Sequence, residues 1–309
     1  MQQLARAVRT LLDADPTTFA GLTTPEGRAW IGRLGQLFDD AAAHWGLAAD
    51  DGPILHGYSA VVVPARRGAT RVAVKLVCPP HAVDDEAAGL SAWAGVGTAR
   101  LLDVDHFRGI LLEERLDASR PLSAKPLGDA ARAAGALIAT LAVKSEAAMP
   151  TTYAHAAAIA ATLDGERSSA TCPLPAAVLE AALQAARQLG AGARRSLVHA
   201  DLHYDNILAS YRPGSPWIAI DPKPLIGDPE RSVAELLWTR ADEMEDDDAI
   251  RTVFDAVVAG GGLDEVVARR WTIARTAEYW LWGSRRGLTE DPRRCERVIR
   301  AMVRDPVHR

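Results

Sequence analysis

The sequence lacks most features of secreted, metal-binding or membrane-spanning proteins. Of its 309 residues only three are cysteine, Cys78, Cys172 and Cys295, and none lies in a CxxC pair or at metal-ligand spacing from a histidine. Isolated thiols of this kind are typical of a reducing compartment. The N-terminus, MQQLARAVRTLLDADP, has neither a sustained apolar segment nor a small-residue cleavage site, and no apolar run approaches membrane-spanning length. We therefore expect a cytoplasmic protein.

The chain also has no excess of basic residues. Lysine and arginine together number 35 against 40 acidic residues, which gives a net charge of −5. Proteins that bind nucleic acids or anionic membrane surfaces usually present a basic face. A nucleic-acid partner and membrane attachment are therefore not expected, and a neutral or cationic small molecule fits the charge better. The sequence does not indicate an oligomeric state.

The predicted secondary structure changes along the chain. Apolar residues at helical spacing alternate with segments rich in β-branched residues up to residue 116, and alanine-rich helical segments follow. The predicted elements are a helix over 29–47, a hairpin of strands 54–65 and 71–77, a helix within 82–96, a second hairpin of strands 99–105 and 109–116, and helices over 127–143, 152–163 and 175–189. No strand is expected between residue 117 and Leu197. The pattern predicts a two-lobe α+β fold, with residues 1–116 as a small antiparallel-sheet lobe with leading helices and 117–309 as a mainly helical lobe.

In SLVHADLHYDNILAS, residues 196–210, a polar stretch lies between two short apolar segments. His199, Asp201 and Asn206 have the spacing HxDxxxxN, which is that of the catalytic loop in protein-kinase-type phosphoryl transfer. An ionised carboxylate can orient an alcohol and accept its proton, while an amide oxygen is a neutral, hard ligand suited to Mg²⁺. We expect His199 to brace the loop, with an ordinary core histidine as the alternative.

Asp221 is a candidate for a second metal ligand. It closes the apolar segment WIAI, residues 217–220, just beyond a short loop that follows Asn206. In the same phosphoryl-transfer chemistry an aspartate at this place holds the metal that bridges the nucleotide phosphates. Because Pro222 follows, a simple turn residue is the alternative.

Lys75 lies inside the apolar segment VAVKLV. Its neighbours Val74 and Leu76 point to the opposite face of a strand, so a buried Lys75 ammonium needs an anion. Nucleotide phosphates would serve, and Glu86, early in the next predicted helix, is the expected ion-pair partner. The alternative is a lysine of an edge strand whose ammonium reaches water.

In these segments the chain resembles the aminoglycoside phosphotransferase superfamily, and more closely its streptomycin 6-phosphotransferase and hydroxyurea kinase branch. The resemblance runs from about Leu55 to Arg240, through AVKL, GILLEERLDASRPL, LVHADLHYDNIL and WIAIDPKPLIGDPERSVAELLW. HADLHYDNIL is typical of the superfamily and IDPKPLIGDP of the branch. The resemblance implies a protein-kinase-like two-lobe fold, a small antiparallel-sheet N-lobe, a mainly helical C-lobe, and the cofactors ATP and Mg²⁺.

The resemblance also implies roles for individual residues. It implies Asp201 as the catalytic base, Asn206 and Asp221 as magnesium ligands, Lys75 as the phosphate lysine, Glu86 as its partner, and the backbone of Glu113, Glu114, Arg115 and Leu116 as the adenine-binding hinge. The phosphate-covering loop should lie in LHGYSAVV, residues 55–62, where only Gly57 is present and the GxGxxG pattern is absent. Ser59 and nearby backbone amides are expected to replace the missing glycines.

Pro222 and Lys223 follow Asp221 in place of the Phe-Gly pair of protein kinases. Lys223 could offer a second positive charge to the transferring phosphoryl group, or it could pair with Asp228. We expect Asp228 to brace the loop together with His199.

A cationic acceptor would need carboxylates near Asp201. The candidates are Glu278 beside Trp282, which could take a guanidinium or a sugar face, and the acidic run of Glu243, Glu245, Asp246, Asp247 and Asp248. For this run the pattern favours an acidic helix start over a substrate site. The aromatic residues near Glu278 are more often part of a core.

These patterns predict an ATP- and Mg²⁺-dependent O-phosphotransferase that modifies a hydroxyl of a small molecule. The first candidate acceptor is an aminocyclitol antibiotic such as streptomycin, with hydroxyurea, another antibiotic or an amino sugar as alternatives. An alternative of another class is a nucleotide-binding pseudokinase, which the shortage of glycine near Gly57 suggests. Intact Asp201, Asn206, Asp221 and Lys75 oppose that alternative.

Overall fold

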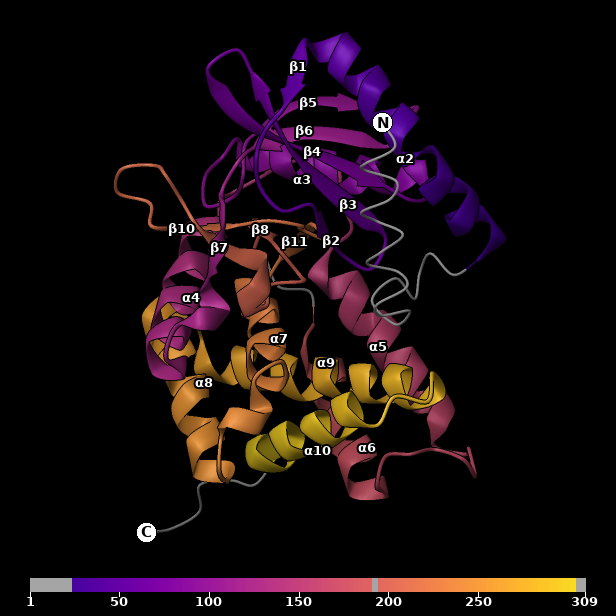
Figure 1. Ribbon diagram of the computed structural model, residues 1–309. Coiled ribbons are helices and arrows are strands. Elements are labelled where there is room, and N and C mark those ends of the chain that lie inside the picture. The colour runs from indigo at the N-terminus through magenta and orange to yellow at the C-terminus, as the bar shows by residue number, and fades with distance from the viewer. Residues whose placement is uncertain (1–23, 191–193, 304–309) are drawn as a thin grey trace. The chain divides into compact units, whose positions relative to one another are not determined.

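The computed structural model of the chain describes residues 24–190 and 194–303 (Figure 1). Its described residues form two compact units, one of 24–95 and 99–116, the other of 96–98, 117–190 and 194–303. The segment 96–98 differs from the predicted division, because its backbone is bonded within the second unit. The carbonyl of Gly97 accepts a hydrogen bond from the Ala219 amide at 2.8 Å, and the carbonyl of Thr98 accepts one from the Arg212 guanidinium at 3.0 Å.

The first unit is an antiparallel sheet with two helices. Its helices are α2 (Pro25–Trp45) and α3 (Val83–Trp93), and its strands are β1 (Leu47–Ala49), β2 (Leu55–His56), β3 (Ala60–Arg67), β4 (Thr70–Val77), β5 (Leu101–Asp105) and β6 (Ile110–Glu114). The strand order is β1-β3-β4-β6-β5, with β2 paired to β3. The two predicted hairpins are confirmed as β3–β4 and β5–β6, and the predicted helix as α2.

The alternation of side chains along β3 and β4 explains how the two helices are placed in this unit. Val61 and Val74 belong to the apolar core that α2 closes with residues such as Leu34, whereas Ala60 and Val77 pack with α3. Leu34 is fully buried, which stabilises the unit by roughly 1.5–3 kcal/mol. Since side chains alternate along a strand, Lys75 faces away from the α2 core.

The second unit is mainly helical. Its helices are α4 (Leu127–Leu141), α5 (Thr152–Glu166), α6 (Ala176–Gln188), α7 (Val233–Trp238), α8 (Asp247–Gly261), α9 (Glu265–Arg285) and α10 (Glu290–Val303), and its strands are β7 (Asp117–Pro121), β8 (Ser196–Val198), β9 (Ile207–Ala209), β10 (Trp217–Ala219) and β11 (Leu225–Gly227). The predicted helices α4, α5 and α6 are confirmed. The expectation of no strand before Leu197 is wrong, because β7 pairs with β9 through an irregular register that the sequence does not reveal.

Close helix contacts explain how this unit packs. α4 packs against α8, where a Cβ on Gly135 would overlap the backbone of Val257. α9 contacts α5, α6, α7 and α10, and Figure 1 shows it among these helices. Trp271 of α9 is fully buried. No described helix is both long and apolar enough to span a bilayer.

Candidate active site

Two short strand pairs of the second unit hold the HxDxxxxN loop. β8 enters the loop and pairs with β11, while β9 leaves it and pairs with β10. Backbone hydrogen bonds connect the loop to the segment around Asp221: the Ile220 amide donates to the Asn206 carbonyl at 2.9 Å, and the Lys223 amide donates to the His199 carbonyl at 2.9 Å. The structure therefore places Asp201, Asn206 and Asp221 in two segments bonded directly to each other.

The backbone is strained at two points of this site. Ala200 and Asp221 both have positive φ, +53° and +59° respectively. A non-glycine residue in this region costs about 1–2 kcal/mol, and aspartate tolerates it better than alanine does. Such conformations cluster at functional sites and persist where the surroundings fix them. Here the Ala200 carbonyl accepts a hydrogen bond from Arg231 Nη2 at 3.3 Å, immediately before Asp201.

His199 is completely buried, and its ring contacts the segment that precedes Asp221. Its Nε2 lies 2.9 Å from the Ile220 carbonyl, and because a carbonyl only accepts, Nε2 must carry the proton. Burial lowers the pKa of His199 to about 4, against the opposing charge of Asp201. The imidazole is therefore neutral at physiological pH and ties the catalytic loop to the segment before Asp221.

Asn206 and Asp221 offer oxygen ligands of the type that Mg²⁺ prefers. The Asn206 amide is largely buried, and its Nδ2 donates to the Asp201 carbonyl at 3.0 Å. This hydrogen bond fixes the amide and turns its Oδ1 away from that carbonyl. Magnesium is usually held by one or two carboxylates together with substrate phosphates. The donor set of an amide oxygen and a carboxylate therefore fits magnesium.

Lys223 pairs with Asp201 itself. Its Nζ lies 2.7 Å from Asp201 Oδ2, and the lysine side chain is 73% exposed against 22% for the aspartate. The alternative that pairs Lys223 with Asp228 is wrong. Asp228 accepts a hydrogen bond from Trp271 Nε1 at 3.3 Å and its amide donates to the Thr152 hydroxyl at 3.1 Å, so it ties the segment after β11 to α9 and α5. Its role in bracing the loop stays a prediction. Burial raises the pKa of Asp228.

Lys75 and Glu86 form a buried ion pair in the first unit. The Lys75 Nζ lies 2.6 Å and 2.7 Å from the two carboxylate oxygens of Glu86, and both side chains are about nine-tenths buried. β4 supplies the lysine and α3 the glutamate. Paired burial of two charges contributes little net stability, because desolvation offsets the attraction. The pair is therefore weak evidence for a stabilising role, and the phosphate-binding role of Lys75 stays a prediction.

The predicted hinge lies where the chain leaves the first unit. Glu113 and Glu114 end β6, and Leu116 is the last residue before the second unit begins. The Arg115 guanidinium donates to Asp50 Oδ2 at 3.1 Å, which directs this side chain into its own unit. No contact of these four residues tests the adenine-binding role, which stays a prediction.

The predicted phosphate-covering loop is a tight turn between β2 and β3. The Gly57 amide donates to the Ala60 carbonyl at 2.9 Å, and the Ser59 carbonyl accepts from the Cys78 amide at 2.9 Å. A Cβ on Gly57 would have no heavy atom within 4 Å. The fold itself therefore does not require glycine at this position.

Comparison with known proteins agrees with these features. The family model described as aminoglycoside/hydroxyurea antibiotic resistance kinase matches residues 44–287. This chain belongs to that family. A streptomycin 6-kinase of Streptomyces griseus is 35% identical over 271 residues, which cover 85% of this chain and 87% of the relative. A hydroxyurea phosphotransferase of Kitasatospora aureofaciens is 34% identical over 284 residues, which cover 90% of this chain and 81% of the relative.

Solved structures confirm the fold of this antibiotic resistance kinase. Aminoglycoside phosphotransferase APH(4)-Ia has a TM-score of 0.60 at 15% identity, with 86% of this chain and 99% of that chain covered. Choline kinase LicA from Streptococcus pneumoniae has a TM-score of 0.56 at 14% identity, with 87% and 99% covered. The predicted two-lobe, protein-kinase-like α+β fold is therefore correct.

The three predicted acceptor ligands of this kinase already contact arginines. Glu278 Oε2 lies 3.2 Å from Arg275 Nη1, and Glu243 binds Arg240 through both carboxylate oxygens. Trp282 is 36% exposed, and the Arg286 guanidinium lies 4.2 Å from the centroid of its ring. Arginine therefore occupies the carboxylates and the aromatic face assigned to a cationic acceptor. The acceptor role of Glu243 and Trp282 stays a prediction.

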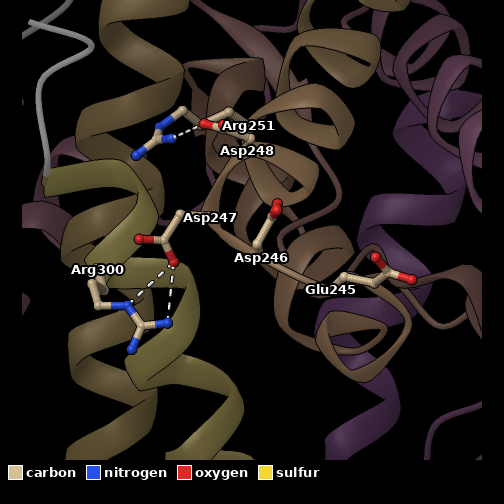
Figure 2. A pocket seen from close by; sticks show the side chains of 6 residues that line it. All are labelled: Glu245, Asp246, Asp247, Asp248, Arg251 and Arg300. Atoms are coloured by element: carbon tan, nitrogen blue, oxygen red, sulfur yellow. Dashed lines mark hydrogen bonds and ion pairs between the residues drawn. The ribbon is translucent and has the colours of Figure 1, made fainter.

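The acidic run begins a helix, as the favoured interpretation predicts. Asp246 caps α8 by accepting a hydrogen bond from the Ala249 amide at 2.8 Å. Figure 2 shows the neighbouring pairs, Asp248 with Arg251 at 2.5 Å and Asp247 with Arg300 at 3.1 Å, around a surface pocket that Glu245 also lines. The run thus stabilises the start of α8 and its packing against α10.

Sequence patterns did not indicate a buried ionic cluster behind the catalytic loop. Arg231 and Glu235 are each 2% exposed, and Arg231 Nη1 lies 2.9 Å from both Glu235 oxygens. The one available signal is their spacing of four residues in RSVAELLW, where two charges share one helical face amid apolar residues. That signal indicates the pair but not what it contacts.

Proposed function

We propose that this kinase transfers the γ-phosphoryl group of ATP to a hydroxyl of a small antibiotic, with a streptomycin-type aminocyclitol as first candidate. The observation that carries the proposal is Asp201, which the strained backbone at Ala200 presents beside Asn206 and Asp221. Relatives named streptomycin 6-kinase, from Streptomyces griseus and Streptomyces glaucescens, support the acceptor at 35% and 34% identity.

In the proposed reaction Asp201 orients the acceptor hydroxyl and receives its proton. The hydroxyl oxygen forms a bond to the γ-phosphorus while the bond from that phosphorus to the β,γ-bridging oxygen breaks, and ADP leaves with that electron pair. Asn206 Oδ1 and the Asp221 carboxylate would hold Mg²⁺, which when bound neutralises phosphate charge. Positioning supplies most of the rate enhancement in this chemistry.

The nucleotide is held by residues of the first unit in this proposal. Lys75 binds the α- and β-phosphates, and Glu86 orients its ammonium through the buried ion pair. The backbone of Glu113, Glu114, Arg115 and Leu116 meets adenine, and Ser59 with neighbouring amides covers the phosphates. Support for ATP comes from the fold neighbour APH(4)-Ia, whose structures include complexes with ADP or AMP-PNP and hygromycin B.

Hydroxyurea is the second candidate acceptor. The specific observation in its favour is the 34% identity to the hydroxyurea phosphotransferase, which extends over 90% of this chain. The chemistry at Asp201 is the same, because hydroxyurea also presents a hydroxyl. The two acceptors differ in charge, so the wall around the acceptor must decide between them.

The test is an ADP-release assay of the purified protein with Mg·ATP against streptomycin, other aminoglycosides, hydroxyurea and amino sugars. We expect selective turnover with streptomycin, and mass spectrometry should detect the phosphorylated acceptor. Turnover with hydroxyurea alone would replace the first candidate by the second. Nucleotide binding with no turnover of any acceptor would contradict a phosphotransferase and favour a pseudokinase.

A further inference from the structure

A single buried guanidinium connects the catalytic loop to the helices behind it. Arg231 Nη1 donates to both oxygens of Glu235, and Arg231 Nη2 donates to the Ala200 carbonyl at 3.3 Å. Ala200 directly precedes Asp201 and has the left-handed backbone conformation. The position of Arg231 therefore affects the backbone of Ala200, and the conformation of Ala200 sets the direction of Asp201.

Arg231 is itself one member of a closed ring of five side chains. Its Nε donates to His155 Nδ1 at 3.3 Å, and since Nδ1 accepts, the proton of the neutral imidazole is on Nε2. That Nε2 lies 3.4 Å from Glu278 Oε2, which also accepts from Arg275 Nη1 at 3.2 Å. Arg275 Nε completes the ring by donating to Glu235 Oε1 at 3.2 Å. We call these five residues the Arg231 ring.

The charges of the Arg231 ring are balanced. Two arginines face two glutamates, so each buried or half-buried charge has an opposite partner and the cost of burial is offset. Burial raises the pKa of Glu278, but the hydrogen bond from His155 and the charge of Arg275 outweigh this and hold it below its usual range. Apolar side chains could fill such a space with similar stability. They could not donate a hydrogen bond to the Ala200 carbonyl.

We propose that the Arg231 ring positions the catalytic loop, with Glu278 acting through His155 and Arg231 on the carbonyl of Ala200. The inference rests on the proposed function, because that function makes Asp201 the catalytic group whose position the Arg231 ring fixes. Glu278 is then a positioning residue that holds His155 and Arg275 in place. It is not a ligand of the acceptor.

The substitution Glu278→Gln separates these two roles. It keeps the size of the side chain and one acceptor oxygen, and it removes the negative charge that balances Arg275 and faces His155. A loosened loop should lower kcat roughly tenfold and leave the acceptor KM within about twofold, because small displacements of a catalytic group are costly. A rise in acceptor KM with kcat retained is the pattern of a lost substrate contact and would overturn the inference.

Glu166→Gln is the matched control. Glu166 is at the C-terminal end of α5 and pairs with Arg285 at the C-terminal end of α9, so it joins the same two helices as His155 and Glu278 do. It is eleven residues from His155, or about 16 Å along the helix. The control should show a similar loss of thermal stability with kcat unchanged. An equal loss of kcat in Glu278→Gln and Glu166→Gln would overturn the inference that Glu278 acts specifically on the catalytic loop.

Hydrogen exchange of the loop amides tests the inference without turnover. With the full-length protein, Glu278→Gln should accelerate exchange over residues 199–206 by roughly tenfold, while Glu166→Gln should leave it unchanged. Unchanged exchange in Glu278→Gln would overturn the positioning role even if the wild-type protein is an active kinase. A wild-type protein without turnover would instead contradict the proposed function, and faster loop exchange would still support the mechanical role of the ring.

Discussion

The free energy of unfolding should fall when the pH drops from neutral to mildly acidic, and His199 should cause part of that fall. Replacing His199 by glutamine should remove this part. His199 is completely buried and donates through Nε2 to the Ile220 carbonyl, and burial lowers its pKa from 6.5 to about 4. Between those pH values the unfolded chain binds a proton that the folded chain does not. This contribution to stability is therefore fully present above about pH 6.5 and falls as the pH decreases toward about 4.

The size of the effect follows from the shift of the His199 pKa. One pKa unit corresponds to about 1.4 kcal/mol, so the whole shift is worth about 3 kcal/mol. Between about pH 7.5 and about pH 5 the wild-type protein should lose about 2 kcal/mol through this residue alone. The glutamine amide can donate to the same carbonyl but does not titrate. The variant should therefore lose about 2 kcal/mol less over that interval, although it is less stable at neutral pH.

The assay is urea unfolding of both proteins at the two pH values, with tryptophan fluorescence as the signal. His203→Gln is the control, because His203 belongs to the same loop but its side chain is 29% exposed. This control removes a histidine from the loop without removing the buried brace. If the free energy of unfolding falls by the same amount in wild type and in His199→Gln as the pH falls, the conclusion that His199 is neutral in the folded protein is refuted.

Two further predictions concern the neighbours of Asp201. Asn206→Ala removes the amide oxygen assigned to the metal and should raise the Mg²⁺ concentration for half-maximal turnover by roughly tenfold, and an unchanged magnesium titration would contradict the ligand assignment. Lys223→Met removes an ammonium 2.7 Å from Asp201 Oδ2 in a largely exposed pair, so thermal stability should hardly change while kcat falls by roughly tenfold. Lys125→Met, at another exposed lysine, is its control, and equal kcat in both variants would exclude a role for Lys223.

Local patterns were sufficient for much of the fold. Alternation of apolar residues predicts β3 and β4 and the face on which Lys75 lies, and Glu86 follows in the next helix at the place where the structure pairs the two. Alanine-rich segments predict α4, α5 and α6 because helix propensity and apolar spacing agree there. The HxDxxxxN loop can also be recognised in the sequence, because its residues are close together in the chain.

Features that depend on distant partners were not predictable. β7 exists because β9 lies beside it, and DASRP alone has no strand pattern. For Lys223 the sequence suggested the phosphoryl group or Asp228, whereas the β8–β11 pairing brings its backbone to His199 and its side chain pairs with Asp201. The Arg231 ring joins residues up to 123 positions apart, from His155 to Glu278. In a single sequence nothing connects such residues.

Asp201→Ala tests the central claim most directly. Wild type and variant are compared with Mg·ATP and the best acceptor of the panel, by ADP release and by mass spectrometry of the acceptor, while ATP binding is measured separately. We predict that the wild-type protein forms the phosphorylated acceptor and that the variant binds ATP normally but turns over at least roughly a hundredfold more slowly. Equal turnover of the two proteins would remove Asp201 from the reaction and contradict the account.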